Sequence, residues 1–195
     1  MAAWIRRSLF RLAIGLGLTV AGASAALAAD AWDALEEPGT VAIMRHALAP
    51  GTGDPPDFEL GNCGTQRNLN DAGRAQARAI GDAFRAHNID VDRVLTSQWC
   101  RCRDTAELLD LGPVEAFPPL NSFYEDRSTG DHQTRRTREL LANLPEDERV
   151  VLVTHQVNIS ALTDEFPSSG EVFVLDVADG GEITVKGEVL IRHGS

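Results

Sequence analysis

The chain has 195 residues, of which 43% are hydrophobic and 24% are charged. This is the composition of an ordinary globular protein, and it excludes a disordered chain, a collagen-like chain and a multi-span membrane protein. Lysine and arginine number 18 against 29 aspartate and glutamate residues, so the formal net charge is −11. Such a chain is not expected to bind nucleic acid through a broad basic face. Any anion chemistry must depend on a local cluster of positive charge.

The first residues have the pattern of an export signal. Arginines at positions 6, 7 and 11 precede an apolar run over 12–20 that is interrupted by glycines, and small residues lead up to Ala28. This pattern predicts a secretory signal peptide over 1–28 rather than a membrane span, with an uncleaved anchor as the alternative. We expect one domain over 29–195, a periplasmic or secreted location, and no stable membrane insertion after cleavage.

Export changes the interpretation of the cysteines at positions 63, 100 and 102. In an oxidising compartment two of the three are expected to form a disulfide. The partner of Cys63 is Cys100 or Cys102, and the sequence does not choose between them. A zinc site at Cys100 and Cys102 would need a second pair of ligands at suitable spacing, which the sequence lacks. We therefore expect no metal and no cofactor.

The hydrophobic pattern predicts alternating strands and helices. Short apolar runs predict strands at 40–44, 91–96, 114–116 and 149–154. Helices are predicted at 70–88, 97–109, 133–144 and 157–163, with Asn70 and Ser97 as the first two N-caps. A long loop separates the first strand from the first helix, and a hairpin is expected over 171–191 around Asp179-Gly180-Gly181. This order predicts an α/β fold, a three-layer α/β/α sandwich with a mostly parallel sheet.

Chemically useful side chains follow three of the predicted strands. Arg45-His46 ends the first, Ser97 follows the second with Arg101 one turn further on, and His155 follows the fourth. Ligands of such sheets bind beyond the carboxyl ends of the strands, so we expect these side chains to converge there. Two histidines and two arginines would form a pocket for a dianion, with an imidazole as the nucleophile.

Four separate stretches resemble the histidine phosphatase superfamily, which has the phosphoglycerate mutase-like fold. The family's strand followed by Arg-His-Gly is matched by Ile43-Met44-Arg45-His46-Ala47, with alanine in place of glycine. Its helix start is matched by Leu69-Asn70-Asp71-Ala72-Gly73-Arg74-Ala75-Gln76-Ala77, its second arginine stretch by Ser97, Arg101, Thr105 and Ala106, and its second histidine by Val151-Leu152-Val153-Thr154-His155. The resemblance covers about residues 40–163.

The resemblance implies roles for particular residues. His46 would be the nucleophile, Arg45 and Arg101 would bind phosphate, and His155 would be the second histidine of the phosphate pocket. The implied reaction is metal-independent hydrolysis of a small phosphomonoester through a phosphohistidine intermediate.

Four parts of this hypothesis have alternatives: the general acid, the role of one arginine, the substrate and the overall function. The general acid is expected at Asp126 or Glu125, and we favour Asp126. Arg67 is either a third guanidinium over the substrate or a structural residue of the long loop. Resemblance to an exported member of the family that acts on a heptose phosphate implies a cell-envelope phosphosugar as the substrate, with a small soluble phosphoester or a phosphoprotein as alternatives. The alternative function is a catalytically weak or inactive domain of the same fold that binds or senses phosphate.

Overall fold

A computed structural model describes residues 31–178 and 181–191. The predicted signal peptide over 1–28 lies outside these residues, as do Asp179 and Gly180 of the predicted turn. The C-terminal Arg192-His193-Gly194, which has the Arg-His-Gly sequence of the family motif, lies outside them as well. Within the two described ranges, no helix combines the length and the apolar character needed to cross a bilayer.

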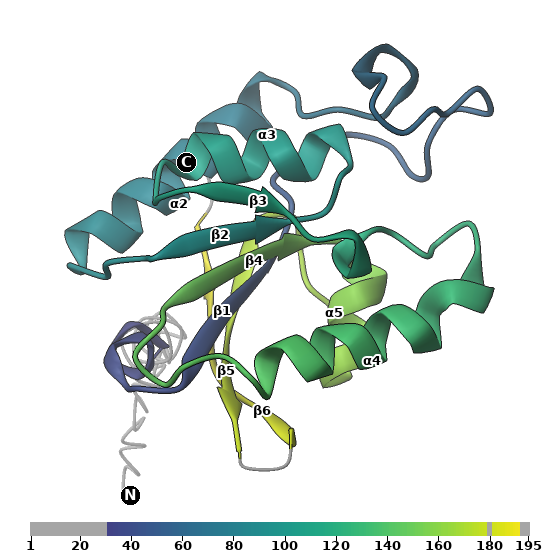
Figure 1. Cartoon of the computed structure of the whole chain (residues 1–195). Helices are drawn as coiled ribbons and strands as arrows, with labels where there is room; N and C mark the ends of the chain where they lie inside the picture. Colours follow the sequence, from purple (N-terminus) through teal and green to yellow (C-terminus); the bar gives the residue numbers. More distant parts are fainter. Residues whose placement is uncertain (1–30, 179–180, 192–195) are drawn as a thin grey trace, which may run out of the picture.

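A six-stranded sheet forms the centre of the fold, in the order β3-β2-β4-β1-β5-β6 (Figure 1). Its strands are β1 (Thr40–Arg45), β2 (Arg93–Thr96), β3 (Val114–Ala116), β4 (Val150–Thr154), β5 (Glu171–Val177) and β6 (Ile183–Leu190). The first four pair in parallel, whereas β5 runs antiparallel to both β1 and β6. The predicted mostly parallel sheet and the predicted C-terminal hairpin are both confirmed.

Helices cover both faces of the sheet (Figure 1). The helices α2 (Asp71–Ala86) and α3 (Cys100–Leu109) lie on one face, and α4 (Gly130–Leu141) and α5 (Gln156–Thr163) lie on the other. Three short 3-10 turns complete the connections, η1 (Cys63–Thr65), η2 (Pro118–Leu120) and η3 (Arg127–Thr129). The predicted three-layer α/β/α sandwich is confirmed.

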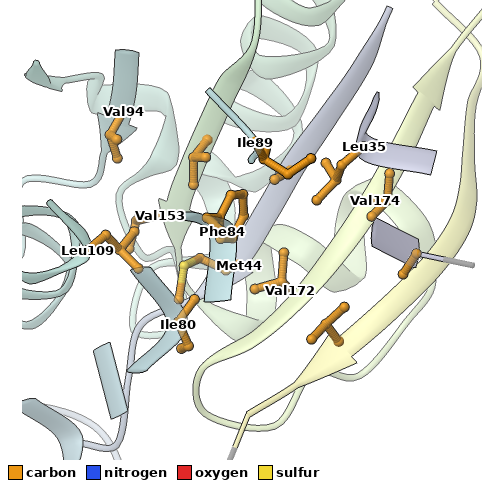
Figure 2. Packing of buried hydrophobic residues seen from close by; sticks show 14 of the residues in the cluster. Leu35, Met44, Ile80, Phe84, Ile89, Val94, Leu109, Val153, Val172 and Val174 are labelled. Atoms are coloured by element: carbon orange, nitrogen blue, oxygen red, sulfur yellow. The ribbon is translucent and has the colours of Figure 1, made fainter. Parts of the chain in front are cut away.

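The alternation of side chains along β1 explains why the sheet is covered on both faces. Met44 packs with Ile80 and Phe84 beneath α2 and α3 (Figure 2). Val41 and Ile43 point to the opposite face, into the cluster under α4 and α5. Because successive side chains of a strand point to opposite faces, a continuous apolar run needs a helical layer on each side.

Two helix starts differ from the sequence prediction. Asn70 is the expected N-cap of α2 and accepts a hydrogen bond from the Gly73 amide at 2.8 Å. The next helix, however, begins at Cys100 with Trp99 as its N-cap, so the prediction that Ser97 caps it is wrong. The Ser97 hydroxyl instead contacts a histidine across the sheet edge. The helix α4 begins at Gly130, earlier than predicted, because η3 leads directly into it.

The long loop over 47–69 is attached to the two helices above the sheet. A disulfide joins Cys63 to Cys100, which resolves the pairing that the sequence left open, and leaves Cys102 buried as a free thiol. Near its start the loop lies against α2, where a Cβ atom at Gly73 would approach the Leu48 carbonyl oxygen to 2.0 Å. The absence of a side chain at Gly73 therefore allows this close approach.

Candidate active site

The register of the parallel strands brings the two predicted histidines together. Arg45 on β1 lies opposite Thr154 on β4, and the His46 amide donates to the Thr154 carbonyl at 2.9 Å. His46 and His155 therefore follow neighbouring strands at the same edge of the sheet. Their ring centroids are 5.6 Å apart, with an angle of 68° between the ring planes.

The hydrogen bonds of His46 determine which ring nitrogen carries a proton. Nδ1 lies 2.7 Å from the Ala47 carbonyl oxygen. A carbonyl oxygen can only accept, so Nδ1 holds the hydrogen and Nε2 keeps its lone pair. Burial and the positive charge of Arg101 lower the pKa of His46 well below its ordinary value. The ring is therefore neutral near pH 7, as a nucleophilic imidazole must be.

His155 is fixed by contacts from the ends of β2 and α3. Its Nε2 lies 2.8 Å from the Ser97 hydroxyl and 3.4 Å from the Cys102 sulfur. Burial and the charge of Arg101 lower the pKa of His155 as well, and burial raises the pKa of Cys102 to about 12. The thiol therefore stays protonated and is unsuited to attack.

Arg45 and Arg101 each have a buried donor without a partner among the described residues. Arg45 is anchored by a hydrogen bond from Nη1 to the Pro167 carbonyl at 3.1 Å. The Nε atoms of Arg45 and Arg101 are buried and have no hydrogen-bond partner within the described ranges. Buried guanidinium donors are normally satisfied, and both side chains line the same cleft. Two unused cationic donors beside two neutral imidazoles are suited to an oxyanion.

Arg67 lines the cleft and also forms hydrogen bonds within the long loop. Its side chain lines the cleft and places a third guanidinium near the histidines. At the same time Nε donates to the Gly53 carbonyl at 2.8 Å, and Nη1 donates to the Ala49 carbonyl. The same residue thus adds positive charge and holds the loop closed.

Asp54 is a buried residue of the site that the sequence analysis missed. Its carboxylate receives Nη1 of Arg101 at 2.7 Å and Nη2 at 3.1 Å. Asp54 lies in a loop rich in glycine and proline, where no hydrophobic periodicity shows which side chains are buried. The nearby sequence therefore does not distinguish Asp54 from the exposed Asp57. The sequence holds only an indirect indication: a buried arginine such as Arg101 requires an anionic partner, so some carboxylate had to lie beside it.

The two predicted acids both line the cleft, but their surroundings differ. The Asp126 carboxylate accepts hydrogen bonds from the hydroxyl and the amide of Ser128, which lower its pKa. It thereby caps η3. Glu125 instead extends toward the loop, where a Cβ atom at Gly53 would lie 3.1 Å from its Oε1. These surroundings favour Glu125 over Asp126 as the general acid, whereas the sequence analysis favoured Asp126.

The cleft has a volume of about 960 Å³ and is polar at its floor and aromatic at its mouth. Phe58 stacks on Trp99 with ring centroids 5.0 Å apart. Tyr124 and Phe166 line the mouth and are 46% and 77% exposed. The cleft therefore has room for a body much larger than the anion that its floor would bind.

No cluster of three or more histidine, cysteine, aspartate or glutamate side chains suited to a metal occurs in the described part of the chain. Four arginines line the cleft: Arg45, Arg67 and Arg101 lie near His46, and Arg127 is exposed.

Structural comparison finds proteins with the same fold. SixA from Agrobacterium tumefaciens, assigned as a phosphohistidine phosphatase, is 23% identical, with a TM-score of 0.56 over 79% of this chain and 99% of its own. The protein histidine phosphatase SixA, solved with tungstate, is 18% identical, with a TM-score of 0.51 over 77% and 96%. A mycobacterial glucosyl-3-phosphoglycerate phosphatase, solved with VO3, is 17% identical, with a TM-score of 0.54 over 78% and 99%.

Sequence comparison finds a family model that matches part of the chain. A search of curated proteins gave no match. The family model of the histidine phosphatase superfamily (branch 1) matches residues 41–121, a segment that contains Arg45, His46 and Arg101. His155 lies beyond this segment and is brought to the site by the pairing of β4 with β1. The partial family match and the shared fold agree with the resemblance to the histidine phosphatase superfamily, branch 1, that the sequence motifs indicate.

Proposed function

We propose that the protein is a phosphomonoester hydrolase in which His46 is the nucleophile. The observation that carries this proposal is the neutral His46 ring, with its Nε2 lone pair retained, beside His155 and three arginines at the floor of one cleft. Phosphoryl transfer depends mainly on positioning and on neutralising the charge of the equatorial oxygens. Guanidinium groups supply that charge here, and the family match agrees with this chemistry.

The reaction would proceed in two steps. In the first, His46 Nε2 attacks phosphorus, the bond from phosphorus to the ester oxygen breaks, and the leaving oxygen takes a proton from a carboxylic acid. In the second, the resulting carboxylate removes a proton from water, the water oxygen attacks phosphorus, and the nitrogen–phosphorus bond breaks. The products are the alcohol and inorganic phosphate, with His46 and the acid restored. His155 and the arginines would bind the equatorial oxygens in both steps.

Glu125 is the proposed general acid. It lines the cleft and lies over Gly53, next to the residue that pairs with Arg101. Asp126 is a poorer candidate, because the hydrogen bonds from Ser128 stabilise its ionised form and so weaken it as a proton donor.

The finer part of the proposal is an exported enzyme that acts on a cell-envelope phosphosugar. The pattern of residues 1–28 supports export, and the disulfide between Cys63 and Cys100 is a bond that persists in oxidising compartments. The aromatic mouth supports a sugar body, because sugar rings pack on aromatic faces. A glucosyl-3-phosphoglycerate phosphatase shares the fold, although so do SixA proteins assigned to phosphohistidine.

A comparison of substrates tests this finer part. With mature protein, we expect kcat/KM for phosphorylated heptose and glucose to exceed that for a phosphohistidine peptide by about 10-fold or more, since a tenfold preference corresponds to a few additional contacts. Steady-state release of inorganic phosphate measures both. Equal or faster turnover of the peptide would contradict the sugar assignment and leave the hydrolase assignment intact.

Replacing the nucleophile tests the hydrolase assignment itself. His46→Ala is expected to lower kcat for p-nitrophenyl phosphate by at least about 1,000-fold, because no covalent intermediate can form. The assay contains EDTA, and wild-type turnover is expected to be unaffected by it because the arginines provide the charge.

His132→Ala is the matched control, since His132 is an exposed residue of α4 away from the cleft. It should retain wild-type kinetics. Substantial turnover by His46→Ala would contradict the role of His46. Absence of turnover in wild type, together with measurable binding of phosphate, would instead support the alternative of a domain that binds or senses phosphate.

The two candidate acids are separated by substrates with different leaving groups. Glu125→Gln is expected to lower kcat by about 100-fold on an alkyl phosphate, which needs a proton on its leaving oxygen. The loss on p-nitrophenyl phosphate should be much smaller, because p-nitrophenolate departs without a proton. Asp126→Asn, the matched variant, should show no such dependence on the leaving group. The opposite pattern would assign the acid to Asp126.

A further inference from the structure

Asp54 is the most heavily bonded side chain at the floor of the cleft. Besides the two bonds from Arg101, its Oδ1 accepts from the Arg67 amide and its Oδ2 accepts from Trp99 Nε1, each at 3.0 Å. The side chain of Asp54 is 10% exposed and that of Arg101 is 3% exposed. A buried carboxylate with four donors is a specific arrangement, because leaving any of these charged groups unpaired would be costly.

These hydrogen bonds exclude Asp54 as the proton donor. Burial alone would raise the pKa of Asp54, but the hydrogen bonds from Arg101 and Arg67 lower it on balance. The carboxylate remains ionised, with each oxygen accepting two hydrogen bonds. Whatever Asp54 contributes to the reaction must therefore act through the groups that it holds.

The group that Asp54 holds most completely is the Arg101 guanidinium. Both terminal nitrogens of Arg101 point at the carboxylate, whereas its buried Nε has no partner within the described residues. A planar guanidinium fixed along one edge has a fixed orientation for its remaining donors. Nη1 also donates to the Arg67 carbonyl at 3.3 Å, so Nε–H and one N–H of Nη2 are the donors of Arg101 without a partner among the described residues, and both have a defined orientation.

Asp54 also sets the charge of the floor. Arg45, Arg67 and Arg101 carry three positive charges, and Asp54 reduces the formal sum to +2. The two histidines add nothing, because both rings are neutral. A phosphomonoester is a dianion near neutral pH, so the charge of the floor matches that of the group it would bind.

We infer that Asp54 is a positioning residue that fixes Arg101 for the transition state and sets the charge of the site for a dianionic phosphomonoester. This inference rests on the proposed function. Without the carboxylate, Arg101 would bind phosphate with both terminal nitrogens and in more than one orientation. Ground-state and product phosphate would then be held more tightly, while the transition state would lose an aligned donor.

Asp54→Asn tests this inference, because the amide keeps the size of the side chain and removes its charge. For p-nitrophenyl phosphate we expect kcat to fall at least about 10-fold, while the inhibition constant of inorganic phosphate falls roughly 5-fold. A residue that merely attaches the loop would instead raise KM and the inhibition constant together. The control is Asp104→Asn, which makes the same substitution in a more exposed ion pair outside the cleft, the one with Arg74, and should leave both constants unchanged.

Asp54→Glu is the second variant, and it carries the test if the asparagine variant does not fold. Glutamate keeps the charge and displaces the carboxylate, so kcat should fall while the phosphate inhibition constant stays within about 2-fold of wild type. The inference is wrong if kcat in the Asp54 variants equals that of Asp104→Asn, or if the inhibition constant rises. Inactive wild-type protein would refute the proposed function instead, and calorimetric titration with phosphate would still test the effect of the Asp54 charge.

Discussion

The parallel pairing of β1 with β4 is the constraint on which the site depends. With Arg45 opposite Thr154, the residue that follows each strand is a histidine, and the two rings meet at one edge of the sheet. A shift of one residue in this register would turn one histidine away and move the apolar side chains of β4 to the wrong face. The packing of two hydrophobic layers therefore fixes the distance between two catalytic candidates.

Burial at this edge gives the side chains their chemical character. Burial of His46 beside Arg101 keeps its imidazole neutral. The hydrogen bond from Nδ1 to the Ala47 carbonyl leaves Nε2 with a free lone pair. The same burial would make three neighbouring guanidinium groups repel one another strongly, and Asp54 offsets part of that repulsion. Burial of the cleft floor therefore has two effects: it keeps both histidines neutral, and it makes a carboxylate necessary to offset part of the charge of the arginines.

The fold and the histidine pair could be predicted from the sequence because periodic patterns specify them. Apolar runs fixed the four parallel strands, and the chemistry of their last residues fixed the edge where ligands bind. Side-chain partners that are distant in sequence could not be predicted in this way. Ser97 has the sequence context of a helix cap but contacts His155, and Asp54 becomes important only when its loop reaches Arg101. The choice between Glu125 and Asp126 likewise depends on which carboxylate is already engaged by Ser128.

Transfer of a phosphoryl group to His46 is the step on which the proposed reaction depends most. The direct measurement is to mix the protein rapidly with a phosphomonoester, quench at alkaline pH where phosphohistidine survives, and locate the added mass by peptide mass spectrometry. The account predicts phosphate on the peptide that contains His46, formed within the time of one turnover. Phosphate on another residue, or turnover with no phosphorylated protein in a single-turnover experiment, would contradict it.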